Sequence, residues 1–503
     1  MLTRRGLLKS AAGAAGVAVL GGAALGAAHV LGHRHKLRRL HSFASPVGPG
    51  PFREFVSRPD LRPPVVSATG GGADPGYLFL GPGAGAGVAG PLLVDERGEP
   101  VWFKPIPKEL WLSNFRPSQY RGQPVVTWWE GKMTRQGYGR GEGVIADSSY
   151  REIARVRAQN GRDIDVHEFV LTREGTALFV CYPESVTADL SPYGASTAAT
   201  IQGSIIQEVD VQSGRLLFEW RSLDHISTEE SYQPPADLFD YMHLNSIYVL
   251  PDDNLLVSAR CTWAVYKLDR RTGAVIWRLG GKRSDFQLGE NAAFAWQHDA
   301  RQPAPSTITL FDDADALFDD GSGMSSPESQ SRGLVLHVDE ERRTARLARS
   351  YRHPKPLVAN AMGSFQTMPS GHVVVGWGSA SVTSEFSEDG KLLADWRLGS
   401  KHSSYRAYRS RWVGRPAEPP AIAAKRIPRH RNTIVYVSWN GDTEVSHWLV
   451  EVGPRRNDLQ PVGIAKRQGF ETAIPLRTSS GYARVRALDA SGRKLASSRA
   501  VGL

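Results

Sequence analysis

The sequence predicts an all-β protein: a six-bladed β-propeller over residues 71–415, followed by a small β-sandwich over residues 416–503. Three observations predict this fold: a β-rich hairpin pattern recurs along the chain, no window reads as a long amphipathic helix, and the character of the sequence changes near residue 416. With 503 residues, 41% hydrophobic and 22% charged, the chain has a globular composition and enough length for several domains. A disordered tail, a collagen and a multi-span membrane protein are excluded.

The N-terminal 32 residues indicate targeting. Residues 3–9 read Thr-Arg-Arg-Gly-Leu-Leu-Lys and precede an Ala- and Gly-rich apolar stretch, residues 11–28. This pattern resembles a twin-arginine export signal, so we expect the twin-arginine machinery to export the folded protein. The protein is then extracytoplasmic: periplasmic, secreted or membrane-anchored. The stretch is nearly long enough to span a bilayer, which leaves a cleaved signal and a retained membrane anchor both open.

Charge is distributed unevenly along the chain. The net charge is +10, yet residues 1–41 hold seven Lys/Arg and no acid, and residues 401–503 hold 19 Lys/Arg against seven Asp/Glu. This leaves −9 for residues 42–400. An acidic central body, without a zinc-finger or RNP pattern, predicts no nucleic-acid partner.

After a basic and then Pro-rich linker over residues 33–70, one hairpin pattern recurs. Each copy places an Asp, a turn and often a Trp between short β-rich runs, at the spacing of propeller blades. The six copies cover residues 92–102, 144–156, 206–220, 265–277, 334–351 and 386–396. A second hairpin alternates with the first, at residues 167–180, 243–258, 298–310 and 364–375. Two hairpins per repeat make a four-stranded blade.

Residues 416–503 predict a separate module. A Pro-Pro pair precedes the strand-like run at residues 433–439, which contains Trp439, and a later run covers residues 482–489. Their arrangement resembles a fibronectin type III or related immunoglobulin-like sandwich. Such modules usually present or dock a partner, so we expect this one to be non-catalytic.

Three of the second hairpins open with a histidine, His167, His243 and His298. Corresponding positions of propeller repeats converge on the axis, so we expect these side chains to face one pocket. A single histidine at a strand start is more often structural. Three at equivalent positions favour a functional site.

Asn245 and Arg260 are expected at the same point. Asn245 follows His243 by two residues and so shares its strand face, and Arg260 ends the return strand of that hairpin. An arginine fork with imidazole and amide donors suits a tetrahedral oxyanion such as sulfate or phosphate. The three histidines could alternatively hold a transition metal, although the positive charge of Arg260 would repel a cation.

The body of the chain, residues 52–416, resembles the bacterial arylsulfotransferase family. Members of that family are six-bladed propellers that move a sulfuryl group from one phenol to another without a nucleotide donor. The motifs that match are Asp165-Val166-His167-Glu168, His243-Leu244-Asn245 with Arg260 seventeen residues after His243, and Trp296-Gln297-His298-Asp299.

The resemblance implies a mechanism and partners. It makes His298 the histidine that becomes sulfated, His167 and His243 its assistants, and Arg260 and Asn245 the binders of the sulfuryl oxygens. It also implies an aryl sulfate donor, a phenolic acceptor, and no metal or organic cofactor. The rival hypothesis is a non-catalytic exported propeller that binds a cell-surface glycan or peptide.

Two further features leave alternatives open. Cys181 and Cys261 could form a disulfide or be buried free thiols, and two cysteines exclude a Cys-based zinc cluster. The acidic run over residues 312–320 could bind calcium or be a solvated loop, and its spacing does not match an EF-hand.

Overall fold

The computed structural model describes residues 37–48, 50–83, 88–134, 136–314, 330–399, 402–427 and 432–503. The regular elements in these residues are β-strands and four short 3-10 helices, which confirms the prediction of an all-β protein. The 3-10 helices are η1 (Ser191–Tyr193), η2 (Ser222–Asp224), η3 (Thr228–Glu230) and η4 (Gly378–Ala380). No helix in the described part is long and apolar enough to cross a membrane. The predicted export signal, residues 1–32, lies outside the described residues.

The chain divides into two compact units. The larger unit contains Gly48–Glu54 and Leu61–Trp412. The smaller unit contains Phe55–Asp60, Val413–Leu503 and the described residues up to Val47. Each unit is described by itself.

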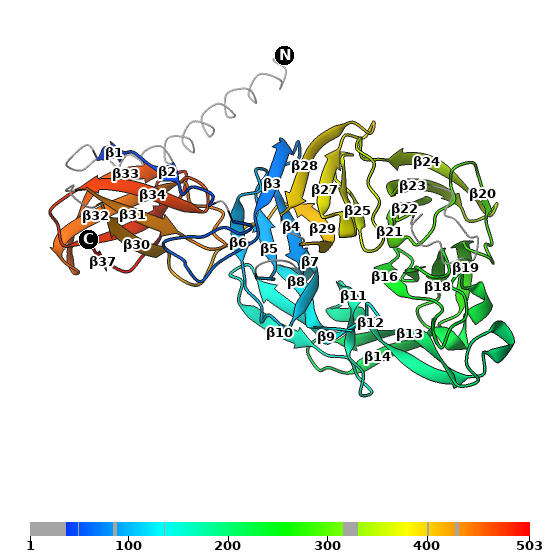
Figure 1. Cartoon of the computed structure of the whole chain (residues 1–503). Helices are drawn as coiled ribbons and strands as arrows, with labels where there is room; N and C mark the ends of the chain where they lie inside the picture. The colour runs from blue at the N-terminus through cyan, green and yellow to red at the C-terminus, as the bar shows by residue number, and fades with distance from the viewer. Residues whose placement is uncertain are drawn as a thin grey trace, which may run out of the picture. The chain divides into compact units, whose positions relative to one another are not determined.

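The larger unit is a series of mainly antiparallel sheets (Figure 1). The first sheet has the order β29 (Ser404–Ser410), β4 (Tyr77–Pro82), β5 (Leu92–Val94) and β6 (Pro100–Phe103). A nine-stranded sheet follows, with β7 (Trp111–Tyr120), β8 (Gln123–Met133), β9 (Gly139–Asp147), β10 (Glu152–Val156), β11 (Ile164–Leu171), β12 (Thr176–Ala188), β13 (Ala199–Asp210), β14 (Leu216–Arg221) and β15 (Leu238–Asp240).

Three more sheets complete the larger unit. They contain β16 (Leu244–Val249), β17 (Leu255–Ala259), β18 (Ala264–Leu268) and β19 (Val275–Gly280); then β20 (Gln287–Leu288), β21 (His298–Ala304), β22 (Thr307–Asp312), β23 (Arg332–Asp339) and β24 (Thr344–Tyr351); then β25 (Ser364–Thr367), β26 (Val373–Gly376), β27 (Val382–Phe386), β28 (Leu392–Leu398) and β3 (Val66–Gly70).

Six strands of the larger unit contact one another in succession. β7 contacts β11, β11 contacts β16, β16 contacts β21, β21 contacts β25, β25 contacts β29, and β29 contacts β7. Between neighbouring sheets lie hydrophobic clusters, one of which joins Leu178 of β12 to Leu244 of β16 and Tyr266 of β18. Sheets that bury both faces explain why strands such as β5 and β17 are apolar runs rather than strict alternations.

The smaller unit consists of two sheets. One contains β1 (Arg38–Leu40), β33 (Asp458–Lys466), β32 (His447–Arg455), β35 (Tyr482–Leu488), β36 (Lys494–Ser497) and β37 (Val501–Gly502); the other contains β2 (Phe43–Ala44), β34 (Glu471–Arg477), β31 (Asn432–Ser438) and β30 (Ala421–Arg426). Val435 of β31, Trp448 of β32 and Val485 of β35 belong to one buried cluster, so the two sheets share a core.

Residues 33–70, which the sequence assigned to a linker, contain three strands. β1 pairs in parallel with β33, β2 pairs with β34, and β3 pairs with β28. These segments have no clear alternation of their own. They become strands because β33, β34 and β28 each offer a row of unpaired backbone groups at a sheet edge.

Candidate functional site

The three histidines of the repeat pattern meet at one cavity of the larger unit. His167 lies in β11, His243 immediately precedes β16, and His298 begins β21. The side chains line a cavity of about 400 Å³ together with Arg260 and Tyr405. Residues 131 positions apart in the sequence therefore share one pocket, because β11 contacts β16 and β16 contacts β21.

Each of these imidazoles is held by a carboxylate at its Nδ1 atom. His298 Nδ1 lies 2.6 Å from Asp313 Oδ2, and the corresponding atoms of His167 and His243 bond to Asp165 and Asp240. An ionised carboxylate only accepts, so Nδ1 carries the proton in each ring. This leaves Nε2 as the atom available for chemistry.

Irregular backbone conformations orient the histidine side chains toward the cavity. The strand register shifts between Leu244 and Ser246 and again after His298, which is the signature of β-bulges that redirect side chains. His243 and Trp296 also have left-handed backbones, with φ of 52° and 56°. Such conformations are costly for residues other than glycine and cluster at functional sites.

The environment of His298 favours a neutral imidazole. Burial lowers the pKa of His298 well below its usual value, and the positive charge of Arg260 and the neighbouring His167 and His243 lowers it further. Since the ring is neutral with Nδ1–H donated to Asp313, Nε2 keeps a lone pair. That is the requirement for an imidazole nucleophile.

Arg260 lies next to His243, where the hairpin placed it. Its backbone N–H donates to the His243 carbonyl at 3.0 Å. The guanidinium lies over the ring of Trp296, 4.6 Å from the centroid, and Nη2 donates to the Asn360 carbonyl at 3.0 Å. Arg260 lines the cavity and brings a fixed positive charge to it.

Asn245 does not reach the cavity in the structure. Its Nδ2 donates to the Gln297 carbonyl at 2.8 Å, and it is absent from the residues that line the cavity. The bulge between Leu244 and Ser246 turns this side chain away from the face it would share with His243 in a regular strand. Asn245 therefore holds the backbone immediately before His298.

A family model described as arylsulfotransferase (ASST) matches residues 116–399, more than half of the chain. The chain belongs to the arylsulfotransferase family. No curated protein that was compared with the chain matches it significantly.

Several solved structures resemble parts of this arylsulfotransferase-family chain at low identity. A protein of unknown function from Bacteroides caccae is 12% identical, with a TM-score of 0.39, and the match covers 67% of this chain and 100% of that one. A catalytically inactive virginiamycin B lyase from Staphylococcus aureus, solved with quinupristin, is 8% identical with a TM-score of 0.35, covering 75% and 97%. A streptogramin B lyase is 10% identical with a TM-score of 0.34, covering 67% and 88%.

A buried charge network centred on Glu168 lies next to His167. Arg406 and Arg301 each contact this carboxylate at 2.9 Å, and Arg116 contacts it at 3.1 Å. Burial opposes ionisation, but the three guanidinium groups hold the pKa of Glu168 well below its usual value. Arg406 also donates to the Asn245 carbonyl at 2.7 Å, so the network supports the opening strands that carry the site.

Sequence reasoning missed two tyrosines. Tyr405 lines the cavity, and its ring centroid lies 5.8 Å from that of His167 and 6.3 Å from that of His298. Its hydroxyl is buried with no hydrogen-bond partner among the described residues, and burial raises the pKa of Tyr405 well above 10. Tyr138 packs 4.8 Å from His243. The signal for Tyr405 was its place in the strand that closes the first sheet, directly before Arg406.

Other aromatic residues near the repeat motifs have structural positions. Trp128, Trp129 and Tyr248 belong to or pack against hydrophobic clusters rather than line the cavity, and Trp263 stacks on Tyr232. Trp111, at the start of β7, lines the cavity instead.

The structure also describes the two cysteines and the start of the acidic run. Cys181 and Cys261 are free and buried, and burial raises the pKa of both thiols. Asp312 and Asp313 are buried rather than solvated, and their carboxylates bond to Arg332 and His298. The other acidic residues of that run, from position 315, lie outside the described residues.

Metal-ligating groups in the described part are sparse at this site. Asp240, His243 and Cys261 place one ligand atom each within 4.8 Å of one another. A metal needs the thiolate form of cysteine, and the raised pKa of Cys261 works against it. The neighbouring charge of Arg260 opposes a cation as well.

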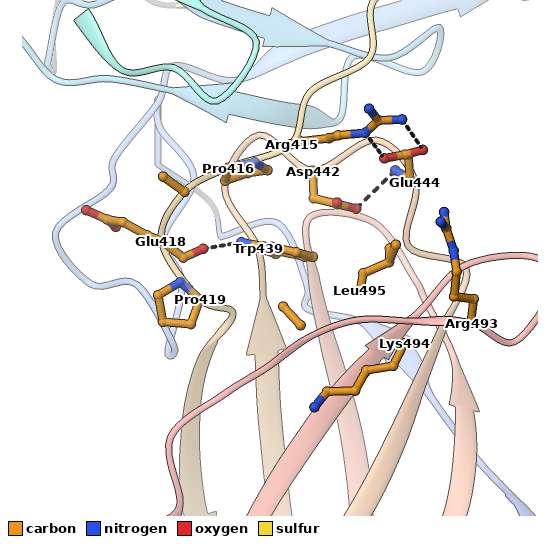
Figure 2. A pocket seen from close by; sticks show the side chains of 12 residues that line it. Arg415, Pro416, Glu418, Pro419, Trp439, Asp442, Glu444, Arg493, Lys494 and Leu495 are labelled. Atoms are coloured by element: carbon orange, nitrogen blue, oxygen red, sulfur yellow. Dashed lines mark hydrogen bonds and ion pairs between the residues drawn. The ribbon is translucent and has the colours of Figure 1, made fainter. Parts of the chain in front are cut away.

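The smaller unit has a cavity with a different character (Figure 2). Arg415 there forms a two-point ion pair with Glu444, at 2.6 and 3.1 Å, and Trp439 donates its ring N–H to the Glu418 carbonyl at 2.6 Å. None of the residues lining this cavity is a histidine, cysteine or hydroxyl residue. Arg415 and Glu444 pair with each other, and the cavity lacks the nucleophile and proton-transfer residues that line the cavity of the larger unit.

Proposed function

We propose that the protein is an exported sulfotransferase that moves a sulfuryl group from an aryl sulfate ester to a phenolic acceptor through a sulfohistidine at His298. Family membership indicates aryl sulfotransferase activity in general. The observation that carries the finer proposal is the His298 imidazole, buried at the cavity with Nδ1 bonded to Asp313 and with a depressed pKa.

The chemistry follows from that imidazole. The Nε2 lone pair attacks sulfur, the bond from sulfur to the aryl oxygen breaks, and the phenol leaves. The acceptor phenol then attacks sulfur and the N–S bond to His298 breaks, which returns the free enzyme in a ping-pong cycle. The Nδ1–H bond to Asp313 stabilises the positive charge that the ring gains while it carries the sulfuryl group.

The other site residues have separate roles in the transfer. Arg260 supplies positive charge to the sulfuryl oxygens, and the Tyr405 hydroxyl is a neutral donor that faces the same space. His167 and His243 handle protons. Asn245 acts through the Gln297 backbone as a positioning residue for His298 rather than as a ligand of the sulfuryl group.

Intact mass spectrometry tests this proposal. After incubation with 4-nitrophenyl sulfate the wild-type protein should gain one sulfuryl group, about 80 Da, and lose it when a phenol is added. His298→Ala should gain none, whereas His243→Ala should gain it more slowly. The proposal is wrong if the added mass maps to a peptide without His298, or if His298→Ala is still labelled.

The alternative of a non-catalytic propeller that binds a glycan or peptide is weaker. Three histidines oriented by carboxylates around one cavity serve proton and group transfer, and binding alone does not need them.

The proposed architecture is a six-bladed propeller with a fibronectin III-like sandwich. Six four-stranded groups support the blade number: β29 with β4 to β6, β7 to β10, β11 to β14, β16 to β19, β21 to β24 and β25 to β28. The pairing of β29 with β4 joins strands from the two ends of the larger unit, as ring closure requires. The shared core of two sheets supports the sandwich.

Export by the twin-arginine route stays a proposal that rests on residues 3–28 alone. It suits a protein that places no disulfide between its two cysteines.

A further inference from the structure

His167 and His243 line the cavity, and their rings also contact each other. His167 Nε2 lies 3.0 Å from His243 Nε2, and the two rings are nearly perpendicular, at 84°. On their far sides, Nδ1 of His167 bonds to Asp165 and Nδ1 of His243 bonds to Asp240. The four side chains therefore form one chain in the order carboxylate, imidazole, imidazole, carboxylate.

This series of four side chains has three contacts at hydrogen-bond distance, and each hydrogen bond needs one proton. Two neutral imidazoles supply only two protons, both required at Nδ1 by the ionised carboxylates. With no third proton, two nitrogen lone pairs would point at each other across 3.0 Å in a part-buried contact. A third proton between the two Nε2 atoms removes this repulsion and completes the chain.

We propose that Asp165, His167, His243 and Asp240 form a proton-holding chain whose extra proton, shared between the two Nε2 atoms, passes to the departing phenolate and is recovered from the acceptor phenol. In the first half-reaction the S–O bond breaks as His298 bonds to sulfur, and the shared proton moves to the aryl oxygen. In the second half-reaction the acceptor O–H gives its proton back to the chain while its oxygen bonds to sulfur and the N–S bond breaks. This inference rests on the proposed function, and protons and electron pairs balance over the cycle.

Within this chain the two aspartates are positioning residues. Their negative charges offset the cost of holding an imidazolium in a buried site. Asp165 is also a structural group, because its other oxygen accepts from the Gly139 N–H at 2.6 Å. Asp240, at the end of β15, is the better residue to change.

The groups around Asp165, His167, His243 and Asp240 make the shared proton easier to transfer. Burial lowers the pKa of His243, Asp240 opposes this, and Arg260 adds to the lowering. An imidazolium with a lowered pKa is a stronger acid toward a phenolate. The titratable and charged groups that interact with the four residues from the surrounding elements are Tyr138, Tyr405, Cys181, Cys261, Arg260 and His298.

His298 differs from this pair in one respect that separates the roles. Its Nδ1 bonds to a carboxylate, no hydrogen bond among the described residues joins its Nε2 to another imidazole, and its pKa is lowered more strongly than that of His243. One histidine with a free lone pair and two that share a proton are what nucleophilic attack and leaving-group protonation respectively require.

Asp240→Asn tests the chain through kinetics. The amide keeps the size of the side chain but removes its charge, so the proton is lost at lower pH, and the alkaline limb of kcat/KM should move down by about 1 pH unit or more. The loss should be at least about 10-fold greater with phenyl sulfate than with 4-nitrophenyl sulfate, because a good leaving group departs without a proton. The matched control is Asp395→Asn, which weakens the buried pair of Asp395 with His353 (2.9 Å) outside the cavity and should leave both the limb and the leaving-group dependence unchanged. An Asp240→Asn loss that is uniform over pH and over leaving groups overturns the chain.

Nitrogen-15 spectra of protein labelled at histidine give a test that does not depend on activity. In the wild type, one ring of the pair should carry protons on both nitrogens at the pH of activity, and Asp240→Asn should lose that signal at a lower pH. Two rings with bare Nε2 throughout the active range would refute the shared proton even in an active sulfotransferase. If the spectra show it but the wild type accepts no sulfuryl group from any aryl sulfate, the proposed function fails and the transfer step fails with it.

Discussion

Replacing the carboxylate behind the proposed nucleophile is the sharpest test of the role of His298. Asp313 Oδ2 accepts the Nδ1 proton of His298 at 2.6 Å, and both side chains are buried. Asp313→Asn preserves the shape of the side chain. Its amide can donate to Nδ1, which forces the proton onto Nε2 and removes the lone pair that attacks sulfur.

The expected magnitude has two parts. A hydrogen bond to a charged group is worth about 1.5–3 kcal/mol, which corresponds to about 10-fold to 150-fold in rate when the bond is strongest in the sulfated state. The wrong tautomer adds to this, as loss of the orienting aspartate does in a Ser-His-Asp triad, where the drop is about 10,000-fold. We expect sulfation of Asp313→Asn to be slower by a factor between about 100 and 10,000.

Single-turnover kinetics measure this directly. The burst of 4-nitrophenolate from excess enzyme reports the sulfation step, and quenched samples analysed by mass give the sulfated fraction. Asp395→Asn, which changes a buried aspartate bonded to His353 away from the cavity, controls for loss of stability. A burst in Asp313→Asn at the wild-type rate would mean that the tautomer of His298 is irrelevant, and the assignment of His298 as nucleophile would have to be withdrawn.

Four further changes have expected outcomes. Arg260→Lys keeps the charge but loses the planar fork, so kcat/KM should fall at least about 10-fold, and unchanged kinetics would remove Arg260 from the site. Tyr405→Phe deletes one neutral donor and should lower kcat about 10-fold with little change in unfolding free energy; an equal rate would exclude a sulfuryl contact. Glu168→Gln removes the carboxylate that three guanidinium groups share, leaving Asp299 as a partner of Arg301 and Arg406, and should cost about 3–5 kcal/mol in urea unfolding at neutral pH. Because the folded pKa of Glu168 is lowered, its contribution is present above the unfolded pKa and is lost as the pH falls, so the difference between wild type and variant should shrink in acid. Replacing Arg4 and Arg5 with Lys should leave a folded protein in the cytoplasm on fractionation, and normal export would contradict the targeting proposal.

Several features could be predicted because the information is local. Alternating apolar residues and turn residues specify hairpins without reference to the rest of the chain, and their recurrence predicted an all-β protein. The same periodicity placed His167, His243 and His298 at equivalent positions, which was enough to infer that they meet. The position of Arg260 beside His243 followed from the length of one hairpin.

The direction of individual side chains could not be predicted in this way. Asn245 should share a face with His243 in a regular strand, but a bulge that the sequence does not announce turns it toward Gln297. The acidic run looked solvated because charge in sequence suggests exposure. In the structure Asp313 is buried, because His298 supplies the proton that its carboxylate accepts.

The sequence by itself determined the strand-rich fold, the histidine set and the family, since these depend on residue type and spacing along the chain. Only the tertiary structure decided which carboxylate holds which imidazole, that Tyr405 from the closing strand joins the cavity, and that two imidazoles meet at 3.0 Å. The physical reason is that Tyr405 and the two facing imidazoles come from segments far apart in the sequence, whereas the carboxylates lie nearer to their imidazoles along the chain but are directed by irregular backbone. Their geometry depends on how the opening strands converge, and no local pattern in the sequence records that distance.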